Sequence, residues 1–264
     1  MKGCTGLLKK RIINKDMLIT GAIMDSRSGA VIEMFHEIGC DVILIDKEHT
    51  AFNYETVSEH IRLARALDIP CMVRVSELNY SELNRTIDQA PDGIYVPRVR
   101  TRQEVENIIK TVKYPPLGIR GMGGSTCPAG KYIGWGSLTD QIEYFNNKFV
   151  IGIQIETAEA ITDLDGILSV PGIDLAVVGN DDLSIGLGIP GQIENPKYTA
   201  TVKEIIAACN RHGVLPGIPC GDPVKIRFWK EQGMRVFWAV SDIGSLWAYA
   251  KQSLEAIRAE LAKP

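Results

Sequence analysis

Short apolar runs alternate with longer amphipathic segments along the whole chain of 264 residues. Such alternation is typical of parallel strands joined by crossover helices. We expect eight strands, at 18–22, 42–45, 71–73, 93–96, 150–154, 175–178, 214–217 and 236–240. Eight repeats of strand and helix in about 250 residues predict a fold of the α/β class, a (β/α)₈ TIM barrel formed by a single domain over residues 1–264.

The segments between these strands have the periodicity of helices. We expect helices at 29–37, 54–66, 80–89, 102–112, 158–168, 196–212 and 223–232, and a last one at 245–262. The stretch 114–138 is irregular and rich in glycine and proline. A connection this long inside a compact domain is usually a lid, a binding loop or a subunit contact. We place it on the catalytic face of the barrel, between the fourth and fifth strands.

Composition excludes several classes of protein. The net charge is −3 and no block is rich in Lys and Arg, so nucleic acid is not an expected partner. No apolar run approaches the roughly 20 residues needed to cross a bilayer. The six cysteines are scattered without a Cys-x-x-Cys pair, which suits a reducing cytoplasm. The segment 121–124 lacks the spacing of a dinucleotide fingerprint and no Walker sequence occurs, so no nucleotide cofactor is indicated.

In a barrel of this kind, the residues just after each strand face the ligand. Here those positions hold Asp46, His49, Arg74, Glu156 and Asp182, each shortly after an apolar run. Charged groups in such places cost desolvation free energy unless they are paired or bind a metal. We therefore expect these residues to form one site at the rim of the barrel.

Two of these carboxylates have two interpretations. Glu156 and Asp182 follow neighbouring strands, so their oxygens could share one divalent cation. They could instead accept backbone N–H groups at the start of the helices that follow. Asp181 and Ser184 are the stronger candidates for that capping role.

The other charged residues also leave alternatives open. His49 is either structural or a general base, and Asp46, three residues earlier, is placed to orient its imidazole. Arg74 is either a salt-bridge partner or a donor to an oxyanion or enolate. Lys47 suggests a Schiff base with a keto acid. Strand alternation points Lys47 away from Asp46, however, and we expect its ammonium to be solvated.

At these strand ends the sequence resembles the HpcH/HpaI-type, metal-dependent pyruvate aldolases, typified by 4-hydroxy-2-oxoheptanedioate aldolase and 2-dehydro-3-deoxyglucarate aldolase. The resemblance runs from the strand at residue 18 to about residue 250. Its specificity lies in the order and spacing of several segments, because each is common alone. These segments are 44–49, 73–74, 96–97, 114–123, 154–157 and 179–184.

The resemblance implies that Glu156 and Asp182 are the protein ligands of a divalent metal ion, Mg²⁺, Mn²⁺ or Co²⁺. Pyruvate would chelate this ion through its carboxylate and keto oxygens. The backbone amides around Asp181 and Asp182 would receive the carboxylate, and Gln154 would neighbour the site. The open positions of such an ion are what catalysis needs.

The resemblance also implies a mechanism. His49, steered by Asp46, would be a base that works through a metal-bound water, and Arg74 would stabilise the enolate oxygen. In the cleavage direction a proton leaves the 4-hydroxyl, the C3–C4 bond breaks, and an aldehyde departs from the pyruvate enolate.

The family forms hexamers in which the C-terminal helix packs on a neighbouring subunit, so the resemblance implies a homohexamer here. Apolar positions along residues 243–261 allow this exchange of the helix between subunits. They equally allow the helix to pack on its own barrel.

The chain departs from the family pattern in two places. Family members commonly read Gly-Pro-Ala-Asp where this chain has Gly-Asn-Asp-Asp at 179–182, which adds the carboxylate of Asp181. The loop after 120–123 lacks the usual arginines, with Lys131 as the nearest counterpart, which argues against a dicarboxylate or sugar-acid substrate. Lys47, Arg98 and Lys131 are local charges to which the pattern assigns no role.

Two other functions stay open. One is a different enolate enzyme on the same metal platform, such as an oxaloacetate decarboxylase or a citrate lyase-like acyl-CoA lyase. The other is a non-catalytic barrel that binds a keto acid or serves in assembly. The presence together of Asp46, His49, Arg74, Glu156 and Asp182 argues against the second, because a structural barrel does not need all of them.

Overall fold

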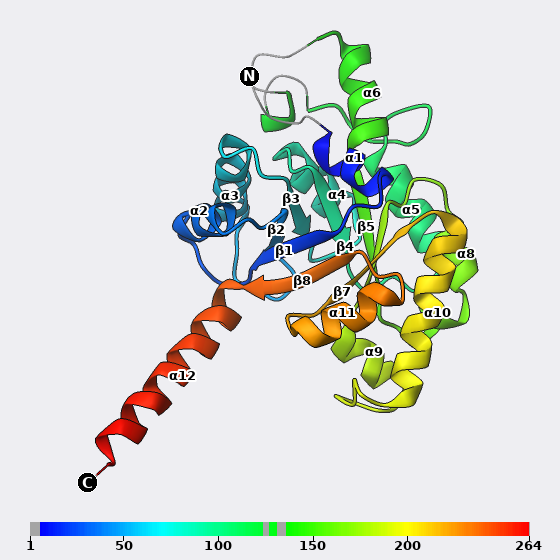
Figure 1. Cartoon of the computed structure of the whole chain (residues 1–264). Coiled ribbons are helices and arrows are strands. Elements are labelled where there is room, and N and C mark those ends of the chain that lie inside the picture. The colour runs from blue at the N-terminus through cyan, green and yellow to red at the C-terminus, as the bar shows by residue number, and fades with distance from the viewer. Residues whose placement is uncertain (1–5, 124–126, 131–135, 264) are drawn as a thin grey trace.

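Eight parallel strands close into a barrel in the order of the chain (Figure 1), in a computed structural model that describes residues 6–123, 127–130 and 136–263. Each strand pairs with its sequence neighbours, and β8 pairs with β1. This confirms the predicted (β/α)₈ barrel. The strands are β1 (Leu18–Ile23), β2 (Val42–Asp46), β3 (Cys71–Arg74), β4 (Gly93–Val96), β5 (Val150–Ile155), β6 (Leu175–Val178), β7 (Leu215–Pro219) and β8 (Val236–Ser241).

Several strands run one or two residues further than the apolar pattern predicts. Asp46 and Arg74 are the last residues of β2 and β3, and the register pairs them with each other. The ladder of a parallel sheet continues through backbone groups, so a charged side chain does not end it. The extension matters because it places these two side chains on adjacent strands at one level of the barrel.

Most expected helices are present with ends within a few residues of the prediction. They are α2 (Ala30–Glu37), α3 (Tyr54–Ala66), α4 (Tyr80–Asp88), α5 (Arg102–Val112), α10 (Pro196–His212), α11 (Pro223–Glu231) and α12 (Asp242–Leu261). The expected single helix at 158–168 is wrong. It is divided into α7 (Ala158–Thr162) and α8 (Leu164–Leu168), because Asp163 leaves the helical conformation with ψ 41°.

The structure adds helices that the periodicity did not predict: α1 (Leu7–Ile13), the 3₁₀ helix η2 (Pro128–Gly130), α6 (Leu138–Lys148) and α9 (Asn180–Gly186). A local sequence motif marks the start of α6. Ser137 accepts the Asp140 N–H, and Asp140 in return accepts the Ser137 N–H, which together form a capping box. The irregular stretch therefore ends at this cap. It runs from the end of α5 to α6, which precedes the start of β5 and lies beside α1 (Figure 1). The expectation that this connection lies on the catalytic face is therefore wrong, because it joins a helix to the N-terminal end of a strand.

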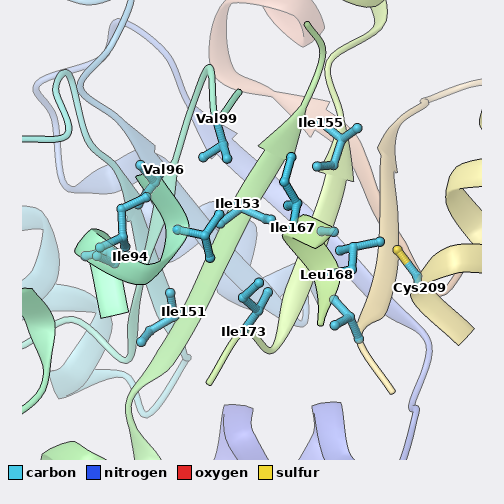
Figure 2. Close-up of a cluster of buried hydrophobic side chains, with 14 of the residues drawn as sticks. Ile94, Val96, Val99, Ile151, Ile153, Ile155, Ile167, Leu168, Ile173 and Cys209 are labelled. Carbon is cyan, nitrogen blue, oxygen red and sulfur yellow. The ribbon is translucent and has the colours of Figure 1, made fainter. Parts of the chain in front are cut away.

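The core has an inner and an outer layer. Inside the barrel pack side chains such as Leu44, Met72 and Tyr95, and α1 closes the N-terminal end with Leu8 and Ile12. Between the strands and the surrounding helices lies the larger outer layer, shown in part in Figure 2. It contains Ile94, Val96, Ile151, Ile153, Ile155, Ile167 and Leu168. These two layers hold the strand ends rigidly, which a site at the rim requires.

Helix α12 projects away from the barrel (Figure 1), and none of its residues is buried. Its first residue, Asp242, accepts backbone N–H groups of Met24, Asp25 and Ser26 and so ties the start of the helix to the end of β1. Further along, Trp247 and Tyr249 are largely exposed. The alternative in which the helix packs on its own barrel is therefore wrong for this chain. Among the described residues, no helix has the length and apolar character to cross a bilayer.

Candidate active site

Arg74 and Asp46 form a buried ion pair at the mouth of the barrel. Arg74 Nε and Nη2 donate to the two oxygens of Asp46 at 2.8 and 2.7 Å. Arg74 Nη1 lies 3.2 Å from Glu48 Oε2. Burial works to lower the pKa of Arg74, but the hydrogen bonds and charge of Asp46 more than compensate and raise it. The guanidinium is therefore a fixed positive charge held in one orientation.

The expectation that Asp46 orients His49 is wrong. Both Asp46 oxygens accept from Arg74, and one also accepts the Glu48 N–H at 3.0 Å. The chain turns directly after β2, where the Thr50 hydroxyl donates to the Asp46 carbonyl at 2.7 Å. The strand register thus directs Asp46 to Arg74 and leaves His49 on the loop.

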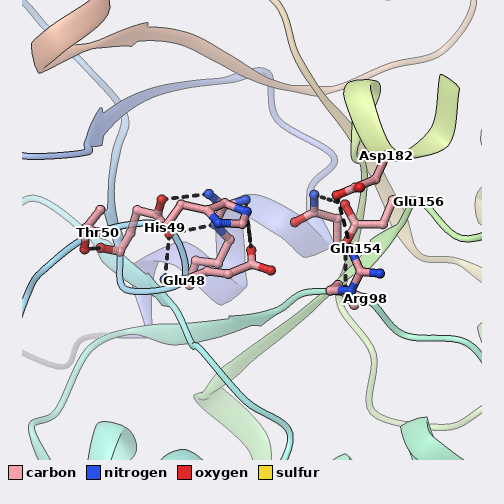
Figure 3. Close-up of polar contacts among 9 residues, drawn as sticks. Glu48, His49, Thr50, Arg98, Gln154, Glu156 and Asp182 are labelled. Atoms are coloured by element: carbon pink, nitrogen blue, oxygen red, sulfur yellow. Dashed lines mark hydrogen bonds and ion pairs between the residues drawn. The ribbon is translucent and has the colours of Figure 1, made fainter. Parts of the chain in front are cut away.

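Glu48, and not Asp46, is the carboxylate that contacts His49 (Figure 3). Its Oε2 lies 3.6 Å from His49 Nε2, while the His49 side chain is 64% exposed. Burial raises the pKa of Glu48, against the lowering effects of the Arg74 and His49 charges. Glu48 is not among the site residues predicted from the sequence. Its position indicates such a role, because Glu48 lies two residues after the end of β2, in a loop expected at the rim.

Lys47 lies on the other side of β2 from Asp46, as strand alternation predicts, but the expectation of a solvated ammonium is wrong. The side chain is buried, and Nζ donates to both oxygens of Glu82 at 2.8 and 2.6 Å. It also lies 3.6 Å above the ring centre of Tyr54. An ammonium paired with a buried carboxylate is a poor nucleophile, so this geometry argues against a Schiff base.

Glu156 and Asp182 lie together on the opposite side of the mouth (Figure 3). Glu156 follows β5 and is 2% exposed, and Asp182 lies in the first turn of α9. Glu156 Oε1 accepts the backbone N–H of Arg98 at 2.7 Å, and Arg98 Nη1 lies 3.5 Å from Asp182 Oδ2. Gln154 Nε2 donates to Glu156 Oε2.

Charged groups on both sides of the barrel mouth affect the pKa of Glu156. The pKa of Glu156 is raised to about 7, mainly by burial: the Arg98 N–H and the Arg74 charge lower it, while the charges of Asp182 and Glu48 raise it. A charge shifts the pKa of another group appreciably only when the two groups are near each other. Arg74, Glu48, Glu156 and Asp182 therefore belong to one site.

The capping interpretation of the carboxylates does not hold. Thr157, not Glu156, caps α7 by accepting the Ala160 N–H at 3.1 Å. Asp181 and Ser184 are not N-caps, because both lie inside α9, which starts after Gly179. Ser184 instead donates to the Asp181 carbonyl at 2.7 Å. The carboxylates of Glu156 and Asp182 are thus left for another role.

The hydrogen bonds of Asn180 account for part of the departure from the family pattern at 179–182. Its Nδ2 donates to the Pro219 carbonyl at 2.8 Å and its Oδ1 accepts from the Tyr198 hydroxyl at 2.7 Å. These bonds fix the start of α9 to the end of β7 and to α10. Burial raises the pKa of Tyr198, and the charge of the exposed Asp181 adds to this effect. Lys131 lies outside the described residues.

The donors around Glu156 suit a hard divalent cation. Gln154 Oε1 is buried without a hydrogen-bond partner beside Glu156. A Cβ at Gly179 would lie 2.0 Å from Glu156 Oε2, so only glycine leaves room for this carboxylate. No cluster of three or more His, Cys, Asp or Glu that could hold a metal occurs in the described ranges. The chain would thus supply two carboxylates, as in many Mg²⁺ sites where water and substrate complete the shell.

A closed barrel of parallel strands with an arginine, a histidine and carboxylates on its C-terminal rim defines a TIM-barrel enzyme. Comparison with known proteins agrees. The family model described as HpcH/HpaI aldolase/citrate lyase matches residues 21–220. The 4-hydroxy-2-oxo-heptane-1,7-dioate aldolases of Shigella sonnei and Escherichia coli are each 30% identical over 224 residues, covering 85% of this chain and 84% of the relative.

Solved structures show the same likeness. An HpcH/HpaI aldolase from Desulfitobacterium hafniense superposes with a TM-score of 0.89 at 27% identity, over 97% of both chains. The citrate synthase SbnG has a TM-score of 0.86 at 30% identity, over 97% of this chain and 99% of that one. The chain belongs to the HpcH/HpaI aldolase/citrate lyase family. The predicted family and the prediction of an aldolase-type enzyme are confirmed.

Proposed function

We propose that this chain is a divalent-metal-dependent aldolase that cleaves or forms 4-hydroxy-2-oxo acids through a pyruvate enolate and an aldehyde. One observation carries the proposal: the oxygen donors of Glu156 and Asp182 share a rim with an arginine that Asp46 holds in place. The names of the relatives support the reaction class.

Glu156 and Asp182 would hold the metal ion, with Gln154 Oε1 placed to accept a hydrogen bond from a water beside it. A bound Mg²⁺, Mn²⁺ or Co²⁺ would supply electrophilic stabilisation of the keto-acid oxygens. The backbone amides near Asp181 and Asp182, at the start of α9, are proposed to receive the pyruvate carboxylate.

Arg74 is proposed to stabilise the enolate oxygen. Two of its nitrogens are committed to Asp46, so the side chain keeps its orientation while charge develops on the substrate. A preorganised donor in a water-poor site stabilises a developing negative charge more strongly than the neutral ground state. This difference is what lowers the barrier.

His49 is proposed to take the proton from the 4-hydroxyl in the cleavage direction. Its exposed imidazole stands at the mouth, where an aldehyde portion of the substrate would enter. Glu48 Oε2 lies 3.6 Å from the imidazole Nε2, and Glu48 is proposed to orient His49 in place of Asp46.

We further propose a homohexamer in which α12 packs on a neighbouring subunit, because its apolar side chains have no cover within the described part of the chain. A cytoplasmic location is proposed from the free thiols of Cys40, Cys209 and Cys220. Sedimentation analysis of the full chain beside a chain ending before α12 would test the first of these proposals.

A mixture of metal-stripped protein, Mg²⁺ or Mn²⁺, pyruvate and a panel of aldehydes tests the reaction. Formation of 4-hydroxy-2-oxo acids only when metal is present supports the aldolase. Turnover of oxaloacetate or of CoA thioesters without any aldol product would favour a different enolate enzyme. Binding of pyruvate with no turnover at all would leave a keto-acid-binding barrel.

A further inference from the structure

Arg98 touches both carboxylates of the proposed metal site with two different groups (Figure 3). Its backbone N–H donates to Glu156 Oε1 at 2.7 Å, and its Nη1 lies 3.5 Å from Asp182 Oδ2. The residue follows β4 directly after Pro97, and its backbone is left-handed with φ 54°. A conformation that non-glycine residues avoid is retained where surrounding contacts hold it.

The two contacts differ in what a metal ion would do to them. The backbone N–H uses one oxygen of Glu156 and carries no net charge, so it can remain while another oxygen binds a cation. The guanidinium is a full positive charge, and a divalent ion on Asp182 would repel it at this distance. The Arg98 side chain is 49% exposed and that of Asp182 is 42% exposed, so the guanidinium is free to move into solvent.

The other cationic side chains near the mouth are paired with carboxylates that are not proposed metal ligands. Arg74 is paired with Asp46 and Glu48, and Lys47 is paired with Glu82 on the far side of β2. Each of these has a buried carboxylate of its own. Arg98 therefore differs from them in being a half-exposed charge whose carboxylate partner is a proposed metal ligand.

We propose that the Arg98 guanidinium is an internal counter-cation that occupies Asp182 until a divalent ion displaces it, and that Arg98 thereby sets the metal affinity of the site. The inference rests on the proposed function, because it needs Glu156 and Asp182 to be the metal ligands. It assigns to this chain a weaker, more readily reversible metal site than the same two carboxylates would give without Arg98.

The test is the dissociation constant for Mn²⁺ of the metal-stripped full-length chain, measured from the electron paramagnetic resonance signal of free Mn²⁺. Arg98→Gln removes the charge and keeps the backbone N–H on Glu156. Arg100→Gln is the matched control, because it makes the same change in net charge two residues away at an exposed side chain. We expect Arg98→Gln to bind Mn²⁺ about tenfold more tightly than wild type, and Arg100→Gln to stay within about twofold.

Equal dissociation constants for Arg98→Gln and Arg100→Gln would overturn the inference, as would weaker binding by Arg98→Gln. Arg98→Met repeats the loss of charge and is judged by the same ratio if the first variant does not fold. If wild type binds Mn²⁺ with the affinity of Glu156→Gln, the metal site itself is wrong and the inference fails with it. If wild type binds Mn²⁺ and only the Arg98 ratio is missing, the proposed function stands.

A second measurement uses the unmodified chain. Phenylglyoxal labels accessible arginines, and mass spectrometry locates the label. We expect labelling of Arg98 to rise when Mg²⁺ is added, because the guanidinium leaves Asp182, while labelling of Arg100 stays constant. Labelling of Arg98 that does not change with Mg²⁺ at saturating concentration would contradict the displacement.

Discussion

Asp46 and Arg74 end adjacent strands and meet as a two-pronged ion pair, with nitrogen–oxygen distances of 2.8 and 2.7 Å. The side chain of Asp46 is fully buried, and both of its oxygens accept from Arg74 rather than from the exposed His49. The pair instead fixes the arginine on which the proposed enolate chemistry depends. It also leaves Glu48 as the group that contacts the histidine.

Arg74→Lys keeps the charge but loses the fork of donors that bonds both Asp46 oxygens. We expect kcat/KM for aldol cleavage to fall about 10²- to 10³-fold, because a donor to a developing oxyanion is displaced. The Mn²⁺ dissociation constant should change little, which separates this role from metal binding. Aldol kinetics together with Mn²⁺ titration check both. Wild-type turnover by Arg74→Lys would remove Arg74 from the mechanism.

His49→Gln tests the proton transfer with little risk to the fold. The side chain is 64% exposed, so the melting temperature should not change measurably. The value of kcat should fall about 10²-fold or more, as for the loss of a general base. Steady-state kinetics and a thermal scan on the same sample measure kcat and the melting temperature. A variant with normal kcat would show that another group moves the proton.

Glu156 makes the metal-free protein sensitive to pH. Burial raises its pKa from 4.5 to about 7, so between these values the folded state keeps a proton that the unfolded chain has released. Stability therefore falls as pH rises from 4.5 to 7, by on the order of 3 kcal/mol, and stays low above pH 7. At pH 8 we expect Glu156→Gln to be more stable than wild type in the absence of metal.

Added Mn²⁺ should reverse that order, because a ligand stabilises only the protein that binds it. Urea unfolding of both proteins at pH 5 and pH 8, with EDTA or with Mn²⁺, covers all of these states. Wild type that is more stable than Glu156→Gln at pH 8 in EDTA would mean that the carboxylate is not strained by burial.

Lys47 and Glu82 give a prediction that separates structure from catalysis. Lys47→Met leaves the carboxylate of Glu82 buried without its cation, which typically costs 3–5 kcal/mol. The double variant Lys47→Met, Glu82→Gln should recover most of that loss, since no charge remains buried. Denaturant unfolding of the three proteins measures these differences in stability.

Borohydride treatment with pyruvate should leave Lys47 unmodified, and a trapped adduct there would replace the metal mechanism by a Schiff base.

The strands and most helices follow from the sequence because hydrophobic periodicity and caps are local. Contacts between side chains of different strands depend on the strand register, which joins residues far apart in the sequence. Asp46 lies three residues from His49 in the chain, but the register of β2 and β3 places Arg74 opposite it. The contact of Glu48 with Arg74 depends on the same strand register. The contacts of Arg98 depend on a left-handed residue after a proline, which no periodicity reveals.

The proposal that Glu156 and Asp182 hold a metal ion which makes a pyruvate enolate accessible has one direct test. Metal-stripped protein is incubated with pyruvate in D₂O, and proton NMR follows loss of the methyl signal before and after Mg²⁺ is added. We predict that exchange begins with Mg²⁺, stops with EDTA and is absent in Glu156→Gln. Equal exchange rates with and without metal, or wild-type exchange in Glu156→Gln, would contradict the proposed mechanism.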